Sequence, residues 1–183
     1  MSQFWPHTPY AEDQPHSTAI LTTHVLYRGF QTGAIVGPVV GAARSYALPF
    51  IFPKTSLAAP TPLLPTLLRA AGTGGVWGVG ALAVTLPVRM WGREDIEWRD
   101  RAWRLLENRG QVEVDDWGLV GTALGGLGLL VGRAGARGLS WRMAVGGLGM
   151  GSSAGVVGYM VWRHGINGGK WEEAVPDIEG VTT

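Results

Sequence analysis

One glycine-rich segment has the spacing of a nucleotide-binding loop. The stretch GLGMGSSAG places Gly149, Gly151 and Ala154 in a G-x-G-x-x-A pattern. Glu172 follows about 20 residues later, where a dinucleotide site has an acidic residue for the ribose. Such a site also needs a bounded strand before the glycines, and the sequence has none there. Because the glycines continue a four-residue spacing, helix packing explains them better than a bound dinucleotide.

Histidines and paired carboxylates are the other residues that could bind a metal or act as acid and base. His7, His16 and His24 lie 9 and 8 residues apart in a segment broken by prolines. This spacing matches no common set of metal ligands, so we expect solvated side chains. Asp115 and Asp116 could form an acid/base pair, but they stand at the expected start of a helix. Helix capping and the positive end of the helix dipole suit them better.

Composition limits the remaining chemistry. The chain has no cysteine, which excludes disulfides, iron–sulfur ligation and thiolate zinc sites. A net charge of +1 provides no basic surface for nucleic acid. We therefore expect no catalytic, cofactor-binding or metal-binding residues. Membrane lipids are expected partners, and a bound phospholipid is compatible with the sequence.

The distribution of charge predicts an all-α membrane protein. Of the 183 residues, 46% are hydrophobic and only 16% are charged, which is fewer charges than a soluble domain usually has. Charged residues are absent from 70–88, 117–132 and 143–162. These windows are close to the roughly 17 to 25 residues that a helix needs to cross a bilayer.

Three regions are expected along the chain. They are an extended N-terminal arm at 1–17, a transmembrane bundle at 18–163 and a polar tail at 164–183. The bundle should contain about four spans, at 18–43, 70–88, 117–132 and 141–162. The first can cross only if Arg28 snorkels or faces a partner, and Pro38 should kink it. The closely spaced prolines between Arg44 and Arg69 predict an irregular segment there.

An amphipathic helix is predicted at 94–109, within the only long hydrophilic stretch. Its apolar face includes Trp98, Trp103, Leu105 and Leu106. Acidic residues four positions before basic ones, at 97 and 101 and at 100 and 104, predict ion pairs along its polar face. We expect the helix to end near Gly110 and to lie on the membrane surface or on a neighbouring protein.

Glycines spaced four apart recur in every predicted span. Small residues at this spacing form one helix face and let two backbones approach closely in lipid. We therefore assign helix packing to Gly29, Gly33, Gly37, Gly41, Gly74, Gly78, Gly121, Gly125, Gly147, Gly151 and Gly155. Small polar residues in the spans are expected to form hydrogen bonds between helices: Gln31, Thr32, Thr73, Thr85, Thr122, Ser152 and Ser153.

Loop charges predict the orientation of the four spans. Both termini and the hydrophilic stretch fall on one side with all 14 acidic residues. The other side has no acidic residue and carries basic residues at 44, 54, 69, 133, 137 and 142. Because positively charged short loops face the negative compartment, both termini should lie on the opposite side of the membrane.

The four-span plan with glycine-rich helix faces and basic turns, over about 18–162, resembles a mitochondrial inner-membrane family. This family includes protein-translocase channel subunits and an accessory subunit of respiratory complex I. More narrowly, WRDRAWRLLENRGQVEVDDW, at 98–117, and the arm MSQFWPHTPY are similar to fungal membrane-embedded accessory subunits of complex I.

The resemblance implies a structural subunit with no redox centre or quinone chemistry of its own. Such a subunit would buttress the membrane arm of complex I in the mitochondrial inner membrane, with both termini in the intermembrane space. Other membrane-arm subunits would then be its partners, contacted through Arg28, Trp98, Trp103, Leu105 and Leu106. The alternatives are an inner-membrane protein translocase subunit and a small-solute carrier.

Overall fold

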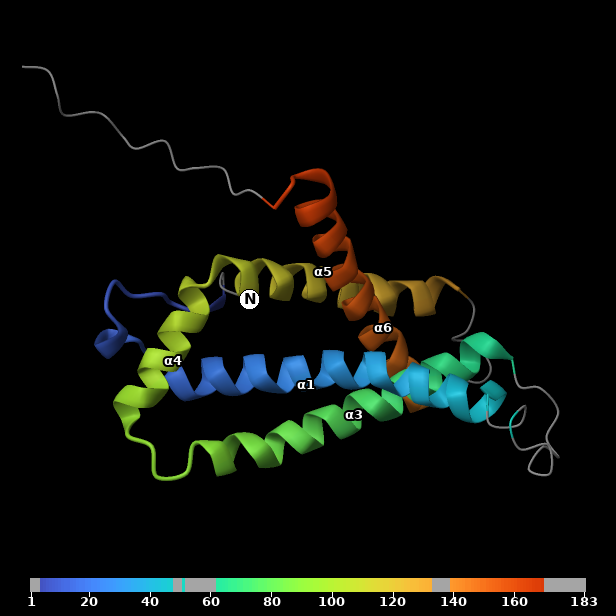
Figure 1. Cartoon of the computed structure of the whole chain (residues 1–183), viewed down its shortest axis with the longest axis horizontal. Coiled ribbons are helices and arrows are strands. Elements are labelled where there is room, and N and C mark those ends of the chain that lie inside the picture. The colour runs from blue at the N-terminus through green and yellow to red at the C-terminus, as the bar shows by residue number, and fades with distance from the viewer. Residues whose placement is uncertain (1–3, 48–50, 52–61, 133–138, 170–183) are drawn as a thin grey trace, which may run out of the picture.

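The computed structural model describes residues 4–47, 51, 62–132 and 139–169, and the regular elements in these residues are all helical (Figure 1). The long helices are α1 (Ser17–Ala42), α3 (Leu63–Arg89), α5 (Arg109–Val131) and α6 (Trp141–Met160). The shorter α4 (Asp95–Glu107) precedes α5, and a 3-10 turn (Ala11–Asp13) precedes α1. Two π-helical turns, Ala43–Ala47 and Val161–Ile166, extend α1 and α6.

The long helices form two packed pairs. Figure 1 shows α1 and α3 side by side and running in opposite directions, and they contact each other along most of their length. The second pair is α5 with α6, and α6 also packs on α3 and α1. The short helix α4 lies across one end of α1 and α3, where it contacts α1, α5 and the N-terminal arm.

Glycines bring the backbones of α1 and α3 into contact. A Cβ atom added at Gly33 would lie closer than 3.0 Å to the carbonyl oxygen of Gly74. One helical turn away, a Cβ at Gly29 would meet the carbonyl oxygen of Gly78 at 2.6 Å. Both approaches are too short for a methyl group, so any side chain at these positions would push the helices apart.

The same geometry holds the second pair together and joins it to the first. Added Cβ atoms at Gly121 and Gly125 of α5 would clash with the backbone of α6 at Gly151 and Gly147. Between α3 and α6, a Cβ at Gly72 would clash with the backbone at Arg142 and Gly146. At all eleven glycines assigned to packing, an added Cβ atom would lie within 3.0 Å of an atom in a neighbouring helix.

Helix starts differ from the sequence expectations in two places. Asn108 caps α5, where its side chain accepts a hydrogen bond from the Gln111 backbone N–H at 3.1 Å. The capping role predicted for Asp115 and Asp116 is therefore wrong, because they lie in the second turn of α5. Gly110, predicted to end the preceding helix, lies in the first turn of α5.

The proline-rich segment is regular at its end. Irregular backbone was expected up to Arg69, and this expectation is wrong from Leu63 onwards, where α3 begins. Pro65 falls in the first helical turn, where backbone N–H groups have no partner within the helix, so proline is tolerated there. Residues 48–50 and 52–61 lie outside the described residues. In α1 the helix continues past Pro38 to Ala42 without a break.

Three helices in the described residues are long and apolar enough to cross a membrane. They cover Leu63–Arg89, Arg109–Val131 and Trp141–Ile166, and each contains an 18-residue window with a mean hydropathy of 1.3. These helices indicate association with a membrane. By the same measure α1 does not qualify, since His24, Arg28 and Gln31 interrupt its apolar sequence.

Candidate functional site

A buried carboxylate pairs with two basic side chains between α1 and α5. The Asp115 side chain is 5% exposed, and its Oδ2 lies 2.7 Å from Nδ1 of His24. Its Oδ1 lies 2.9 Å from Nη2 of Arg28. His24 and Arg28 are four residues apart, so both extend from the same face of α1. We call Asp115, His24 and Arg28 the charged triad.

The triad corrects the sequence expectation for one of its basic residues and adds a contact for the other. His24 was expected to be solvated, but its side chain is only 12% exposed and contacts a carboxylate. Arg28 was expected to snorkel or to face a partner, and in the structure its ion-pair partner belongs to the same chain. The role of Arg28 in contacting another protein stays a prediction.

Uncharged groups connect the triad to α6. Nη1 of Arg28 donates to Oε1 of Gln31 at 3.0 Å, and Nε2 of Gln31 donates to Oγ of Ser152 at 2.9 Å. The Tyr27 hydroxyl lies 2.8 Å from the same Ser152 oxygen and 3.3 Å from Oγ1 of Thr122. These bonds make a continuous polar network across α1, α5 and α6.

Gly118 makes room for this network. A Cβ atom added there would lie 2.5 Å from Nε2 of Gln31 and 2.9 Å from the Tyr27 hydroxyl. A methyl group at position 118 would thus displace the side chains that join α1 to α6. Gly118 was not among the predicted packing glycines, although it lies three residues before Gly121 and so on the same side of α5.

Hydrogen bonding between helices was correctly predicted for some polar residues and wrongly for others. It is confirmed for Gln31, Thr122 and Ser152. The Thr122 hydroxyl also donates to the carbonyl oxygen of Gly118 in its own helix. The prediction is wrong for Thr73, Thr85 and Ser153, whose hydroxyls bond, among the described residues, only to the carbonyl four residues earlier in their own helix. Thr32 lies on the wall of the groove between α1 and α3.

Little space remains beside the charged triad. The cavity that borders His24 and Asp115 has a volume of about 10 Å³ and is closed by Trp5, Ile20, Leu105, Leu106 and Val112. That volume is at the lower limit for one water molecule. His24 and Asp115 are therefore closely packed between side chains at this cavity.

The N-terminal arm packs on α4 in residues 4–16, which differs from the extended, solvated arm expected from its prolines. Nε1 of Trp103 donates to the carbonyl oxygen of Thr8 at 2.9 Å, and the His7 ring stacks on Trp103 with 5.9 Å between ring centroids. Arg99 donates to the carbonyl oxygen of Glu12 at 2.5 Å. These contacts hold the described part of the arm against the helix.

The apolar face of α4 thus faces the same chain. Leu105 and Leu106 border the small cavity near the charged triad, and Trp98 borders a groove next to Leu26 and Leu86. Their predicted contact with a partner protein remains untested. Both predicted ion pairs on the polar face of α4 are confirmed, with N–O distances of 3.9 Å for Arg101–Glu97 and 2.9 Å for Arg104–Asp100.

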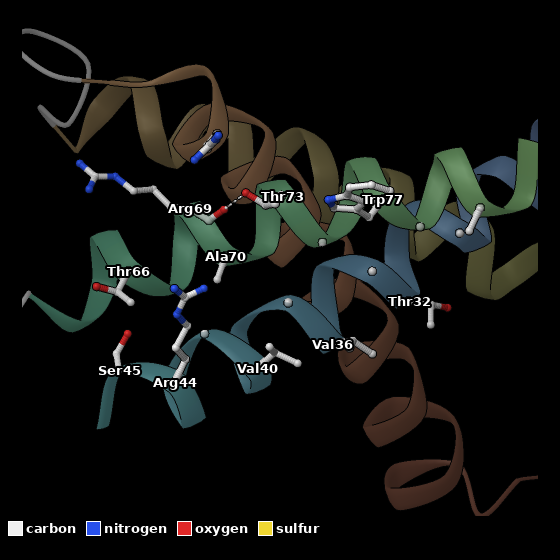
Figure 2. A pocket seen from close by; sticks show the side chains of 18 of the residues that line it. Thr32, Val36, Val40, Arg44, Ser45, Thr66, Arg69, Ala70, Thr73 and Trp77 are labelled. Atoms are coloured by element: carbon white, nitrogen blue, oxygen red, sulfur yellow. Dashed lines mark hydrogen bonds between the residues drawn. The ribbon is translucent and has the colours of Figure 1, made fainter. Parts of the chain in front are cut away.

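A long groove follows the seam between α1 and α3 and has a volume of about 1140 Å³ (Figure 2). Glycines and apolar side chains form most of its wall, including Val36, Val40 and Trp77. Arg44 and Arg69 lie at one end, together with Arg142 from α6. We call this the α1–α3 groove.

The glycines considered for nucleotide binding pack against neighbouring helices, and the described histidines and carboxylates form no cluster of three. Gly149 faces Ala34 and Phe30 of α1, and Gly151 faces α5 at Gly121. Glu172 lies outside the described residues. Within the part of the chain that the structure describes, no three His, Asp or Glu side chains gather as a metal site would require.

A family model described as a protein of unknown function, DUF1757, matches residues 1–161. The chain belongs to this family. No curated protein matches its sequence. The region shared with DUF1757 extends from the N-terminal arm to the start of the π-helical turn after α6. The polar network and the α1–α3 groove therefore both lie within it.

Proposed function

We propose that this DUF1757 protein is a non-catalytic structural subunit in the membrane arm of mitochondrial respiratory complex I. The observation that carries the structural role is the polar network, whose groups bind one another across three helices. With only about 10 Å³ beside Asp115, the network suits joining helices better than conducting or converting a substrate. The resemblance of 98–117 and of the arm to fungal complex I accessory subunits supports the assignment to this complex.

The outer surface of the helices supports contact with lipid and with other membrane subunits. Large apolar side chains point outward from α1, α3 and α5, and a surface of this kind is stable only in contact with lipid or protein. They include Val36, Val39, Val40, Trp77, Val84, Val120, Leu124, Leu127 and Leu130.

We infer that α1 is a fourth span beside α3, α5 and α6. Its 26 residues correspond to about 39 Å of helix, which exceeds the roughly 30 Å of bilayer hydrocarbon. The charge of Arg28 carries a smaller penalty because it forms an ion pair with Asp115. In this interpretation the glycine contacts of α1 with α3, and of α5 with α6, are the packing faces of a four-span bundle.

The distribution of charge supports an orientation with both termini in the intermembrane space. Arg44, Arg69 and Arg142 lie at the end of the bundle opposite α4, and this end would face the matrix. In this orientation α4 lies on the intermembrane-space side, at the membrane surface or on a neighbouring subunit. The loop residues Lys54, Arg133 and Arg137, which also entered the prediction, lie outside the described residues.

Migration on a native gel tests the assignment to complex I. Mitochondrial membranes that contain the tagged chain are solubilised in mild detergent, and the gel is stained for NADH dehydrogenase activity. We expect the tag to migrate with the active band. Migration with a protein translocase, or as a free small protein, would contradict the proposal. The first of these results would favour the translocase alternative.

Single cysteines test the fourth span, since the natural sequence has none. Thr8→Cys marks the arm and Ser45→Cys marks the far end of α1. If α1 crosses the membrane, a membrane-impermeant maleimide added to intact mitoplasts should label position 8 and not position 45. Equal labelling of both positions would place α1 on one side and leave three spans.

A further inference from the structure

We propose that the α1–α3 groove binds an anionic phospholipid. The phosphate would lie at Arg44, Arg69 and Arg142, and one acyl chain would follow the seam towards Gly29. The observation behind the proposal is an apolar groove about as long as one leaflet, which ends at three arginines that have no carboxylate partner among the described residues. The inference goes beyond the proposed function, and it requires only that the helices lie in a membrane.

The shape of the groove suits an acyl chain. Its lining follows α1 from Gly29 to Gly41, and these two residues are 12 positions or about 18 Å of helix apart. This length is close to one leaflet, half of the roughly 30 Å hydrocarbon core. The glycines of α1 and α3 provide a floor without side chains. Val36, Val40 and Trp77 line the groove and each has more than half of its surface exposed.

The three arginines form a cationic mouth from three separate elements. Arg44 follows the end of α1, Arg69 lies in the second turn of α3, and Arg142 is the second residue of α6. Figure 2 shows Arg44 extending from the end of α1 towards α3, with Arg69 at the same end of the groove. All three side chains belong to exposed residues.

Acidic residues are absent from this end in the described part of the chain. The ten described acidic residues fall in 12–13 and 94–116, in the arm, in α4 and its N-cap, and in the first turns of α5. None of the three arginines forms an ion pair with a described residue, and Arg142 contacts the ring of Trp141, with 5.4 Å from its Cζ to the ring centroid. The positive charge at the mouth is therefore left for an external anion.

A phospholipid satisfies both parts of the site with one molecule. Guanidinium groups bind phosphate oxygens in paired hydrogen bonds, and basic pockets between membrane helices on the matrix side suit anionic headgroups. An apolar helix from another protein would fill the groove but leave the arginine charges uncompensated. A soluble phosphate ion would neutralise the arginines but leave the apolar wall uncovered.

Lipid binding by the purified full-length chain tests the proposal. Native mass spectrometry in neutral detergent compares phosphatidylglycerol with phosphatidylcholine of the same acyl chains. We expect the anionic lipid to bind at least about 25-fold tighter, since each basic residue near a phosphate contributes about fivefold. The double variant Arg44→Gln, Arg69→Gln should weaken phosphatidylglycerol by about 25-fold and bring it close to phosphatidylcholine.

Two matched controls separate the site from general effects. Arg89 is an exposed arginine at the other end of α3, so Arg89→Gln should leave the preference unchanged. Val40→Trp fills the groove and should weaken both lipids by at least about fivefold. Val84→Trp adds the same ring to an exposed position outside the groove, so the binding of both lipids should stay unchanged.

The unfolding temperature measured without lipid shows that each variant is folded. The double variant Arg44→Lys, Arg69→Lys keeps both charges and should retain most of the preference for phosphatidylglycerol. The proposal is overturned if the two lipids bind equally to the natural chain, if Arg89→Gln acts as strongly as the double variant, or if Val40→Trp leaves binding unchanged. Equal binding of inorganic phosphate and phosphatidylglycerol would also overturn the role of the groove.

Discussion

Replacing Asp115 by asparagine should destabilise the bundle more than any other single carboxylate change in α4 or α5. The substitution keeps the size of the side chain and removes its charge. Arg28, whose side chain is 27% exposed, would then have only uncharged amide oxygens as partners: those of Gln31 and Gln111, at 3.0 and 2.9 Å, and that of the substituted side chain. His24 would lose its carboxylate contact as well.

The size of the effect follows from the geometry. Two unit charges about 4 Å apart attract by roughly 4 kcal/mol at an effective dielectric constant of about 20. Desolvation of a carboxylate that is 5% exposed offsets part of this attraction, and loss of one partner from a buried pair costs about 3–5 kcal/mol. We therefore expect Asp115→Asn to lower the free energy of unfolding by about 3 kcal/mol, at the lower end of that range because Arg28 is partly exposed.

Unfolding in mixed micelles provides the measurement. The purified chain is titrated with sodium dodecyl sulfate in a neutral detergent, and the fluorescence of its nine tryptophans reports loss of packing. Asp100→Asn is the matched control because Asp100 pairs with Arg104 on the exposed face of α4. An exposed pair contributes about 0.5 kcal/mol or less, so the control should remain close to the natural chain.

A double-mutant cycle isolates the ion pair from other effects. Arg28→Gln in the Asp115→Asn background removes the uncompensated charge, so the double variant should be more stable than the sum of the single losses predicts. We expect a coupling of about 2 kcal/mol. If the two substitutions are additive, or if Asp115→Asn stays within about 0.5 kcal/mol of the natural chain, the triad does not stabilise the bundle as argued.

Two of the remaining predictions use the same unfolding assay and the third uses proteolysis, each with a paired control. Gly33→Ala should lower the free energy of unfolding by at least about 2 kcal/mol because its Cβ would clash with the backbone of α3. At Gly80 an added Cβ meets open space, so Gly80→Ala should raise the free energy of unfolding by up to about 1 kcal/mol. Equal effects of the two substitutions would contradict the packing argument. Ser152→Ala should cost about 1–2 kcal/mol because it removes the shared partner of two side chains, and Ser153→Ala, which loses only a bond within its own helix, should cost less. Trp103→Phe removes the bond to the arm and should increase proteolytic cleavage near Thr8, while Trp91→Phe, at a residue 86% exposed, should leave the cleavage rate unchanged.

Helix packing could be predicted from the sequence because it depends on a local repeat. Residues four apart share one helix face, so the glycines at 29, 33 and 37 could be assigned to a contact before the neighbouring helix was known. The ion pairs on α4 are predictable for the same reason, since Glu97 and Arg101 lie one turn apart.

The charged triad could not be predicted because its members are distant in sequence. His24 and Asp115 are 91 residues apart, and no local pattern reports such a contact. A second signal misled the interpretation. The start of the third span was taken from the end of the charged stretch, which made Asp115 a helix cap, whereas α5 continues back to Arg109 through the charges. The four-residue spacing of His24 and Arg28 was the one signal that could have placed both on a common face.

Glycines without side chains affect the stability of the bundle in opposite directions. They let helix backbones pack closely, but they also weaken each helix and leave a groove beside the contact. Each glycine within a helix costs about 1 kcal/mol relative to alanine, and this cost is recovered where backbones touch, as at Gly33 and Gly74. Beside that contact the same missing side chains leave the seam shallow, so the walls of the α1–α3 groove lose packing partners. A bound acyl chain would restore those contacts without separating the helices. The seam that joins α1 to α3 should therefore be more stable with lipid than without it, and bulkier residues on the groove wall should reduce that dependence.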